Sequence, residues 1–410
     1  MVVVLPQQDT AAGGWGYTVD SQMRSFWEVE AWSDADVVVI GGGLIGVQTA
    51  LRIAQTEPNR RVMLLERGLV PTGASTRNAG FACIGSISEV VADIDLLGQD
   101  AAVDIVRRRY EGLQGLMQTC QGYDVGFTRD GGHEIFLEHH PSLDRIDEVN
   151  ELLRPITNVT TFIRDDLRAR EFGFAPHVRH LVTSPVEGTL HSGKLVDVLW
   201  GLAQRAGVMI RTGAEVMSIE DATDHATVHV RVGTSDYQVR TGNVVVSTNA
   251  WIPELVSTGI ASQIQPARGQ IIITEPLASM PLRGSYHYDE GYVYFRPVND
   301  RILLGGARNL AFDQERTTSH DVTEDIQGAL ETLLREVIAP YQPNIRIEHR
   351  WAGTMAFSPS KHPIVERVSS HVTVAFGCNG MGVALSHSIA QRVTEVLGTG
   401  VLGTEVQRYV

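Results

Sequence analysis

Cysteine and clustered positive charge are both scarce in this sequence. The three cysteines, Cys83, Cys120 and Cys378, show neither CxxC spacing nor the histidine pairing of a metal site, so no metal is expected. A small, odd number of cysteines favours reduced thiols and a cytoplasmic protein. The formal net charge is −14 and no cluster of Lys or Arg stands against it, which argues against nucleic acid as a partner.

Long apolar runs are missing as well. No stretch approaches the roughly 20 consecutive apolar residues of a membrane span. Pro6 interrupts the apolar residues 1–5, and no basic segment precedes a long apolar run, so a secretory signal is not expected. What is present is the composition of a soluble globular protein, with 43% hydrophobic and 20% charged residues, in a chain long enough to predict two domains.

The most informative segment is residues 36–67, which predict a strand, a glycine turn, a helix and a second strand. Gly41 permits the sharp turn, Gly43 lets the backbone approach a pyrophosphate, and Gly46 lets the helix pack close to the sheet. Glu66 lies 20 residues after Gly46, where an acid accepts hydrogen bonds from an adenosine ribose. The segment predicts a dinucleotide site and by itself leaves NAD and FAD open.

A second glycine-rich element, residues 72–81, follows the acid closely. An NAD dehydrogenase has no need of it, whereas a flavin extends beyond the pyrophosphate and needs small residues and backbone donors around it. The two elements together resemble the D-amino acid oxidase (DAO) superfamily of flavoproteins, which includes glycine oxidase, sarcosine oxidase, D-amino acid dehydrogenase and γ-glutamylputrescine oxidoreductase. An NAD-dependent dehydrogenase stays open as a rival, as does a flavin-binding subunit of a larger complex.

Five more segments extend the resemblance over most of the chain. They are similar to the family's interdomain helix start, its turn near the flavin diphosphate, two substrate-domain strands and its C-terminal glycine loop, at residues 189–195, 247–251, 268–270, 294–297 and 377–382. The resemblance implies an α/β (mixed α+β) fold, in which an FAD domain with a doubly wound Rossmann-type sheet is interleaved with a mostly antiparallel substrate domain.

The expected division of the chain follows from this resemblance. A lead-in is expected at residues 1–35. The FAD-binding domain is expected to consist of residues 36–120, 186–254 and 345–410. The substrate domain is expected to consist of residues 121–185 and 255–344.

The resemblance also implies the chemistry. FAD takes a hydride at flavin N5 from the carbon of a small amine or amino acid, and the resulting imine is hydrolysed by water. The alternative within the superfamily is C–O oxidation of a 2-hydroxy acid. Reduced flavin passes its electrons to O2 or to another electron-transfer acceptor.

The cofactor residues are carried over by position from the family's motifs. They are Gly41, Gly43, Leu44, Ile45, Gly46, Glu66, Arg67, Ala74, Ser75, Arg77, Asn78, Ala79, Gly80, Phe81, Val216, Thr248, Asn249, Ala250, Trp251, Gly353, Asn379, Gly380, Met381 and Gly382. A solvated turn is the competing interpretation for Arg77 and Asn78.

Tyr294, Arg296, Lys361 and His362 are the four candidates for the chemistry on the substrate. Strand alternation puts Tyr292, Tyr294 and Arg296 on one face, which suits an anionic substrate, although an ordinary aromatic face fits equally well. Lys361 could meet a carboxylate or the flavin's pyrimidine edge, and His362 could accept an amine proton. An exposed loop lysine and a structural histidine are the plainer interpretations.

Departures from the family limit what can be carried over. Ser358 stands where D-amino acid oxidase and glycine oxidase are expected to have a carboxylate-binding arginine, so another group must hold any carboxylate. Residues 353–363 contain no cysteine for covalent attachment, which predicts noncovalent FAD and leaves Cys378 as a weak candidate. Residues 302–306 contain no lysine of the kind that helps oxygen react in sarcosine oxidase, which favours a dehydrogenase.

Apolar periodicity gives a coarse secondary structure. Helices are expected at residues 90–120 and 323–337, and a short docking helix at 25–28. Separate strands are expected at 237–240 and 244–247.

Overall fold

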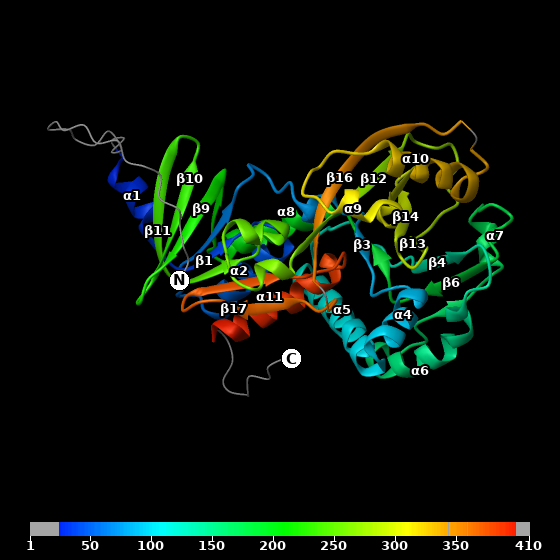
Figure 1. The fold of residues 1–410 in the computed structure, drawn as a ribbon, viewed down its shortest axis with the longest axis horizontal. Helices are drawn as coiled ribbons and strands as arrows, with labels where there is room; N and C mark the ends of the chain where they lie inside the picture. The colour runs from blue at the N-terminus through cyan, green and yellow to red at the C-terminus, as the bar shows by residue number, and fades with distance from the viewer. Residues whose placement is uncertain (1–23, 343, 359, 399–410) are drawn as a thin grey trace.

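The structure, a computed structural model, describes residues 24–342, 344–358 and 360–398. It consists of two eight-stranded sheets with their covering helices, lying side by side (Figure 1). The mixed α/β fold expected from the sequence is confirmed. Most of the expected lead-in, residues 1–35, lies outside the described residues.

The first sheet has a parallel centre in the order β18-β11-β1-β2-β8, with β17 antiparallel at its edge. From β1 the chain crosses to β2 on one side, while β11 pairs on the other, so the strand order reverses between β1 and β11. A doubly wound sheet binds ligands at the carboxyl ends of its strands at such a point. The strands are β1 (Asp34–Ile40), β2 (Val62–Glu66), β8 (Met209–Thr212), β9 (Ala214–Asp221), β10 (Ala226–Val232), β11 (Ser235–Val246), β17 (Ile364–Arg367) and β18 (Val372–Phe376).

Both faces of this sheet are covered, which explains its continuous apolar strands. Val37 and Val39 pack against helices on one face, whereas Val38 and Ile40 pack against the layer formed by β9, β10 and the turn after β11. The strands expected separately at 237–240 and 244–247 form one strand, β11. Its first part pairs antiparallel with β10 and its second part pairs parallel with β1.

The second sheet has the order β16-β12-β15-β14-β13-β4-β6-β5 and is antiparallel except where β13 meets β4. Its strands are β4 (Gly132–Phe136), β5 (Ile163–Arg164), β6 (His180–Ser184), β12 (Gln265–Thr274), β13 (Ser285–Tyr288), β14 (Val293–Val298), β15 (Arg301–Gly306) and β16 (Ile347–Phe357). The division at residue 345 assigns β16 to the first domain, yet β16 pairs with β12 in the second sheet. The short strands β3 (Phe81–Ala82) and β7 (Gly188–Thr189) form a separate pair.

Helices α2, α5, α8 and α11 contribute to one hydrophobic core on the first sheet, and α10 covers one face of the second. The helices are α1 (Phe26–Ser33), α2 (Leu44–Thr56), α3 (Ala74–Arg77), α4 (Ile87–Leu97), α5 (Gln99–Thr119), α6 (Ile146–Thr157), α7 (Arg168–Glu171), α8 (Ser192–Arg205), α9 (Phe312–Glu315), α10 (Glu324–Leu333) and α11 (Gly382–Leu397). Short 3₁₀ helices occur at η1 (Pro141–Arg145), η2 (Asn249–Glu254), η3 (Ala261–Gln263) and η4 (Arg308–Ala311), and η5 (Leu334–Ile338) is π-helical.

Three helix expectations need correction. The helix expected at 90–120 is two helices, because Gly98, with φ 88°, ends α4 and separates it from α5. The helix expected at 323–337 ends at Leu333 and continues as the π turn η5. Helix α1 does form, but its contact with the sheet is made by Trp32, which stacks on Tyr237 at 4.6 Å.

The aromatic residues expected to dock α1 do not do so. Phe26 and Trp27 are 69% and 72% exposed among the described residues. No helix in the described part of the chain is both long and apolar enough to cross a bilayer.

Candidate functional site

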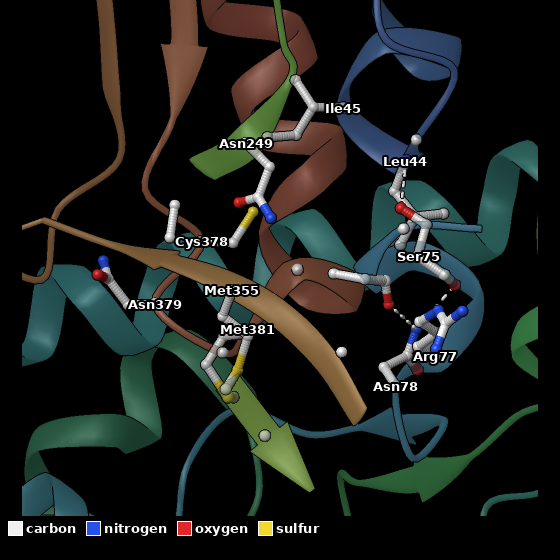
Figure 2. A pocket seen from close by; sticks show the side chains of 18 of the residues that line it. Leu44, Ile45, Ser75, Arg77, Asn78, Asn249, Met355, Cys378, Asn379 and Met381 are labelled. Atoms are coloured by element: carbon white, nitrogen blue, oxygen red, sulfur yellow. Dashed lines mark hydrogen bonds between the residues drawn. The ribbon is translucent and has the colours of Figure 1, made fainter. Parts of the chain in front are cut away.

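A cavity of about 760 Å³ begins at the carboxyl ends of the first sheet's strands and reaches the second sheet. Residues from both glycine elements, from the loop before α11 and from β12 to β16 line it. Pockets for small ligands typically measure about 300–1,000 Å³, so this one has room for a sizeable molecule. Figure 2 shows part of its wall in close view.

At one end, the acid predicted to bind ribose is fixed against the glycine turn. Gly42 N donates to Glu66 Oε2 and Gly68 N donates to Glu66 Oε1, both at 2.8 Å. Each carboxylate oxygen keeps further acceptor capacity for a ligand hydroxyl. Gly41 adopts φ 101°, as the sharp turn requires. A β-carbon on Gly46 would lie 1.9 Å from Gly41 O, so only glycine lets α2 pack this closely.

The second glycine element is tied to the first by Ser75. Leu44 N, at the start of α2, donates to Ser75 Oγ at 2.9 Å (Figure 2), and a β-carbon on Gly43 would come within 2.8 Å of that oxygen. The first amides of a helix have no partners within the helix and bind anions readily. Residues 41–46 and 72–81 therefore form one backbone cradle.

Arg77 and Asn78 hold this cradle in place. Arg77 donates to the carbonyls of Thr72, at 2.6 Å, and Ala352, at 2.8 Å, which links the element to β16. Asn78 Oδ1 accepts from Gly80 N at 2.8 Å and from Ser192 Oγ at 2.7 Å. Both side chains have specific partners, so the solvated-turn interpretation does not describe them.

The loop before α11 closes the cavity from the C-terminal side. Asn379, at φ 49°, accepts a hydrogen bond from Ser358 N and donates to Gly377 O, both at 2.8 Å. Met381 belongs to this loop, and Met355 lies close to it: a β-carbon on Gly380 would be 3.9 Å from Met355 Sδ (Figure 2). Ser358, the residue in place of the expected arginine, thus helps to hold the loop in position through its hydrogen bond to Asn379.

A row of residues across the second sheet faces the cavity. His287 pairs with Tyr294, Tyr294 with Gly305, and Gly305 with Ile271 on successive strands. All except Gly305 line the cavity. A β-carbon on Gly305 would lie 2.7 Å from Tyr294 Cε2, so this glycine makes room for the tyrosine ring. The ring of Phe81 makes edge-to-face contacts with the rings of His287 and Tyr294, with 5.2 and 5.9 Å between the ring centres.

His287 is a site residue that the sequence did not reveal. Its side chain is only 8% exposed and lines the cavity, and neither ring nitrogen has a hydrogen-bond partner among the described residues. Burial lowers the pKa of His287 to about 4, with the charge on Arg109 in the same direction and that on Glu89 opposing it. The imidazole is therefore neutral at neutral pH and offers one donor and one acceptor.

An ion pair between α5 and α4 lies near His287, and a second one joins α4 to Lys361, which follows β16. Arg109 Nη2 donates to Glu89 Oε1 at 2.9 Å, and Lys361 Nζ donates to Asp93. Burial opposes ionisation of Glu89, but the charge and hydrogen bond of Arg109 together with the charge on Lys361 outweigh it, so the pKa of Glu89 is lowered. Lys361 lines the cavity as expected, already paired with an acid.

Most of the predicted cofactor residues line the cavity. The exceptions are Gly46, Gly80 and Ala250. Of the substrate candidates, Tyr294 and Lys361 line it, whereas Arg296 and His362 do not. Arg296 Nη1 donates to Gly80 O at 3.0 Å and so supports the second glycine element from behind. His362 provides the carbonyl that accepts from Ser358 Oγ.

Cys83 and Cys378 also line the cavity. Burial raises the pKa of Cys378 to about 12 and that of Cys83 well above its ordinary value, the latter helped by Glu187. Protonated thiols are weak nucleophiles. No group of acids, histidines and cysteines suited to a metal ion occurs among the described residues.

The donor set of the cavity fits FAD. Glu66 and the start of α2 suit an adenosine and a diphosphate, as a dinucleotide requires. Beyond them, Gly269 and Gly353 pair across β12 and β16 and both line the cavity. A nicotinamide dinucleotide would leave the second glycine element, residues 72–81, without use.

Known proteins resemble the chain over most of its length. The family model described as FAD dependent oxidoreductase (DAO) matches residues 36–396. The probable oxidoreductase OrdL of Haemophilus influenzae is 24% identical over 371 residues, or 88% of this chain and 83% of that protein. The γ-glutamylputrescine oxidoreductase of Escherichia coli is 25% identical over 379 residues, with the same two coverages. The crystal structure of L-proline dehydrogenase from P. horikoshii superposes with a TM-score of 0.74 at 18% identity, covering 90% of this chain and 94% of that one.

Proposed function

Because the chain belongs to the FAD-dependent oxidoreductase (DAO) family, whose cofactor is FAD, we propose that it oxidises the C–N bond of a small amine or amino acid. FAD, when bound, supplies the two-electron acceptor that takes a hydride from the substrate carbon. The carbon–nitrogen bond becomes an imine, which water hydrolyses to a carbonyl compound and a released amine or ammonia.

His287 is the observation that carries this proposal. A buried polar side chain without partners is costly, and one that lines a ligand cavity gains its partners when the ligand binds. A neutral imidazole accepts a hydrogen bond from an amine N–H and leaves the nitrogen lone pair free to stabilise the electron-poor carbon. With its pKa at about 4, His287 orients the amine and does not store its proton.

Tyr294 and Phe81 define the space in which the reacting carbon is held. The two rings meet edge to face beside His287, with 5.9 Å between their centres, and Phe81 is the last residue of the second glycine element. Apolar rings around a reacting carbon exclude water, which strengthens each polar contact to the substrate. The paired ions Glu89 and Arg109 keep this wall electrically balanced.

The names of two of these similar proteins support oxidation of a C–N bond. The relative from E. coli is named for γ-glutamylputrescine and the structural neighbour for L-proline, both of which contain oxidisable amines. Product analysis tests the proposal. We expect one carbonyl compound and one amine or ammonia for each pair of electrons transferred to an artificial acceptor. Turnover of 2-hydroxy acids without release of an amine would contradict it.

A further inference from the structure

Five cationic side chains line the cavity, and four of them have partners among the described residues. Arg77 donates to main-chain carbonyls. The other three lie within 4.0 Å of acids, in the pairs Arg67–Glu215, Arg109–Glu89 and Lys361–Asp93. The fifth, Arg308, has no acid within 4.0 Å and no hydrogen bond in the part of the chain that the structure describes.

Arg308 is held by aromatic rings. Its guanidinium carbon lies 4.4 Å from the ring centre of Phe357, 5.1 Å from that of Phe312 and 5.4 Å from that of Tyr292. The residue before it, Ala307, has the left-handed conformation at φ 59°, which is uncommon for a residue other than glycine. The three rings come from different segments and restrict where the guanidinium can move. Rings over its face leave the in-plane N–H donors available.

An unpaired guanidinium in the partly buried cavity wall is a favourable binding site for an anion. Burial lowers the pKa of Arg308, and electrostatic interactions with Tyr292 and Tyr294 oppose this effect. An arginine stays protonated nevertheless, so its charge is only partly compensated without a ligand. A bound carboxylate would accept two parallel hydrogen bonds from the planar guanidinium and neutralise its charge.

We propose that Arg308 binds the carboxylate of the substrate, which makes the substrate an amine that carries a carboxylate. This inference rests on the proposed amine oxidation. A carboxylate fits better than a phosphate because a single guanidinium balances one negative charge, and the other cations of the cavity are already partnered. Arg308 thus takes the role that the sequence left without a residue when Ser358 replaced the expected arginine.

Binding of simple carboxylates to the oxidised FAD-loaded protein tests this inference without turnover. Acetate and butyrate are compared with acetamide and butyramide, by perturbation of the visible flavin spectrum and by calorimetry. The variants are Arg308→Gln, Arg308→Lys and, as the matched control, Arg316→Gln, an exposed arginine outside the cavity.

We expect the wild type and the control to bind the acids and to bind the amides much more weakly. Arg308→Gln should raise the Kd for the acids about ten- to hundred-fold while FAD affinity stays unchanged, and Arg308→Lys should lie between. Equal binding of acids and amides, or unchanged acid binding in Arg308→Gln, would overturn the inference. Loss of FAD from both Arg308 variants would also overturn it and assign Arg308 to the cofactor. Failure of the proposed function would appear separately, as no flavin reduction by any amine.

Discussion

The ring of Tyr294 lies over Gly305 on the neighbouring strand, so close that a β-carbon on Gly305 would come within 2.7 Å of Tyr294 Cε2. The same β-carbon would lie 2.8 Å from Ile271 Cγ1 and 2.9 Å from Gln270 O. The tyrosine can therefore keep its position on the cavity wall only while residue 305 has no side chain.

Gly305→Ala should displace Tyr294 and disturb the substrate end of the cavity. We expect kcat/KM for the amine substrate to fall about ten-fold, and the free energy of unfolding to fall by about 1–3 kcal/mol, because overpacking forces neighbours to move. FAD titration should show nearly unchanged affinity. Gly328→Ala is the control: this glycine lies within α10 with open space around it, so alanine should be neutral or stabilise by up to about 1 kcal/mol. Equal effects of the two substitutions would contradict the role of Gly305.

Replacing His287 separates a binding role from a structural one. His287→Leu removes two buried nitrogens that lack partners, so stability should stay the same or rise. Activity should fall, with kcat/KM reduced about ten- to hundred-fold, because the amine N–H loses its hydrogen-bond acceptor. Urea unfolding and steady-state kinetics measure the two effects, with His229→Leu on β10, outside the cavity, as the control. A parallel loss of stability and activity would point to a purely structural histidine.

The flavin should be released intact from denatured protein. Cys83 and Cys378 are the cysteines that line the cavity, and burial raises the pKa of both thiols. After precipitation with trichloroacetic acid we expect a yellow supernatant and a colourless pellet, and the same result for Cys378→Ala. A pellet that stays yellow in the wild type and loses its colour in the variant would show covalent attachment through Cys378.

Stability should depend on pH through Glu187. This fully buried carboxyl accepts hydrogen bonds from Ile84 N at 2.7 Å and Gly85 N at 3.2 Å, and burial raises its pKa from 4.5 to about 8. A raised folded-state pKa gives stability that is complete below pH 4.5 and is lost as the pH rises through 8. Between pH 5 and 8 we expect the free energy of unfolding of the wild type to fall by about 2–4 kcal/mol more than that of Glu187→Gln.

Urea unfolding of the apoprotein at the two pH values measures this difference. Glu134, whose pKa burial raises to about 7, contributes to both proteins and cancels in the comparison. Identical pH profiles for wild type and variant would show that Glu187 is ionised in the folded state.

The cofactor end of the site could be predicted from sequence because local sterics determine it. Gly41 and Gly46 are required by a turn and a helix contact within a few residues of each other, and Glu66 follows at the distance that one βαβ unit imposes. Ser75 and Asn379 were located differently, because residues 72–81 and 377–382 resemble motifs of the flavoprotein family.

The substrate end could not be predicted in the same way. His287, Glu89 and Arg308 come from a strand, a helix and a turn that meet only through tertiary packing. Strand alternation grouped Tyr292, Tyr294 and Arg296 on one face. The two tyrosines line the cavity, but alternation could not show where the cavity ends. Arg296 lies beyond that limit, under Gly80.

Anaerobic mixing of the FAD-loaded protein with a panel of amines, D- and L-amino acids, N-substituted amino acids and 2-hydroxy acids tests the central claim most directly. The absorbance of oxidised flavin is followed, and oxygen is then admitted to show whether O2 is the acceptor. We expect an amine that carries a carboxylate to bleach the flavin, with the 2-hydroxy acids inactive. Bleaching by 2-hydroxy acids, with every amine inactive, would contradict the account.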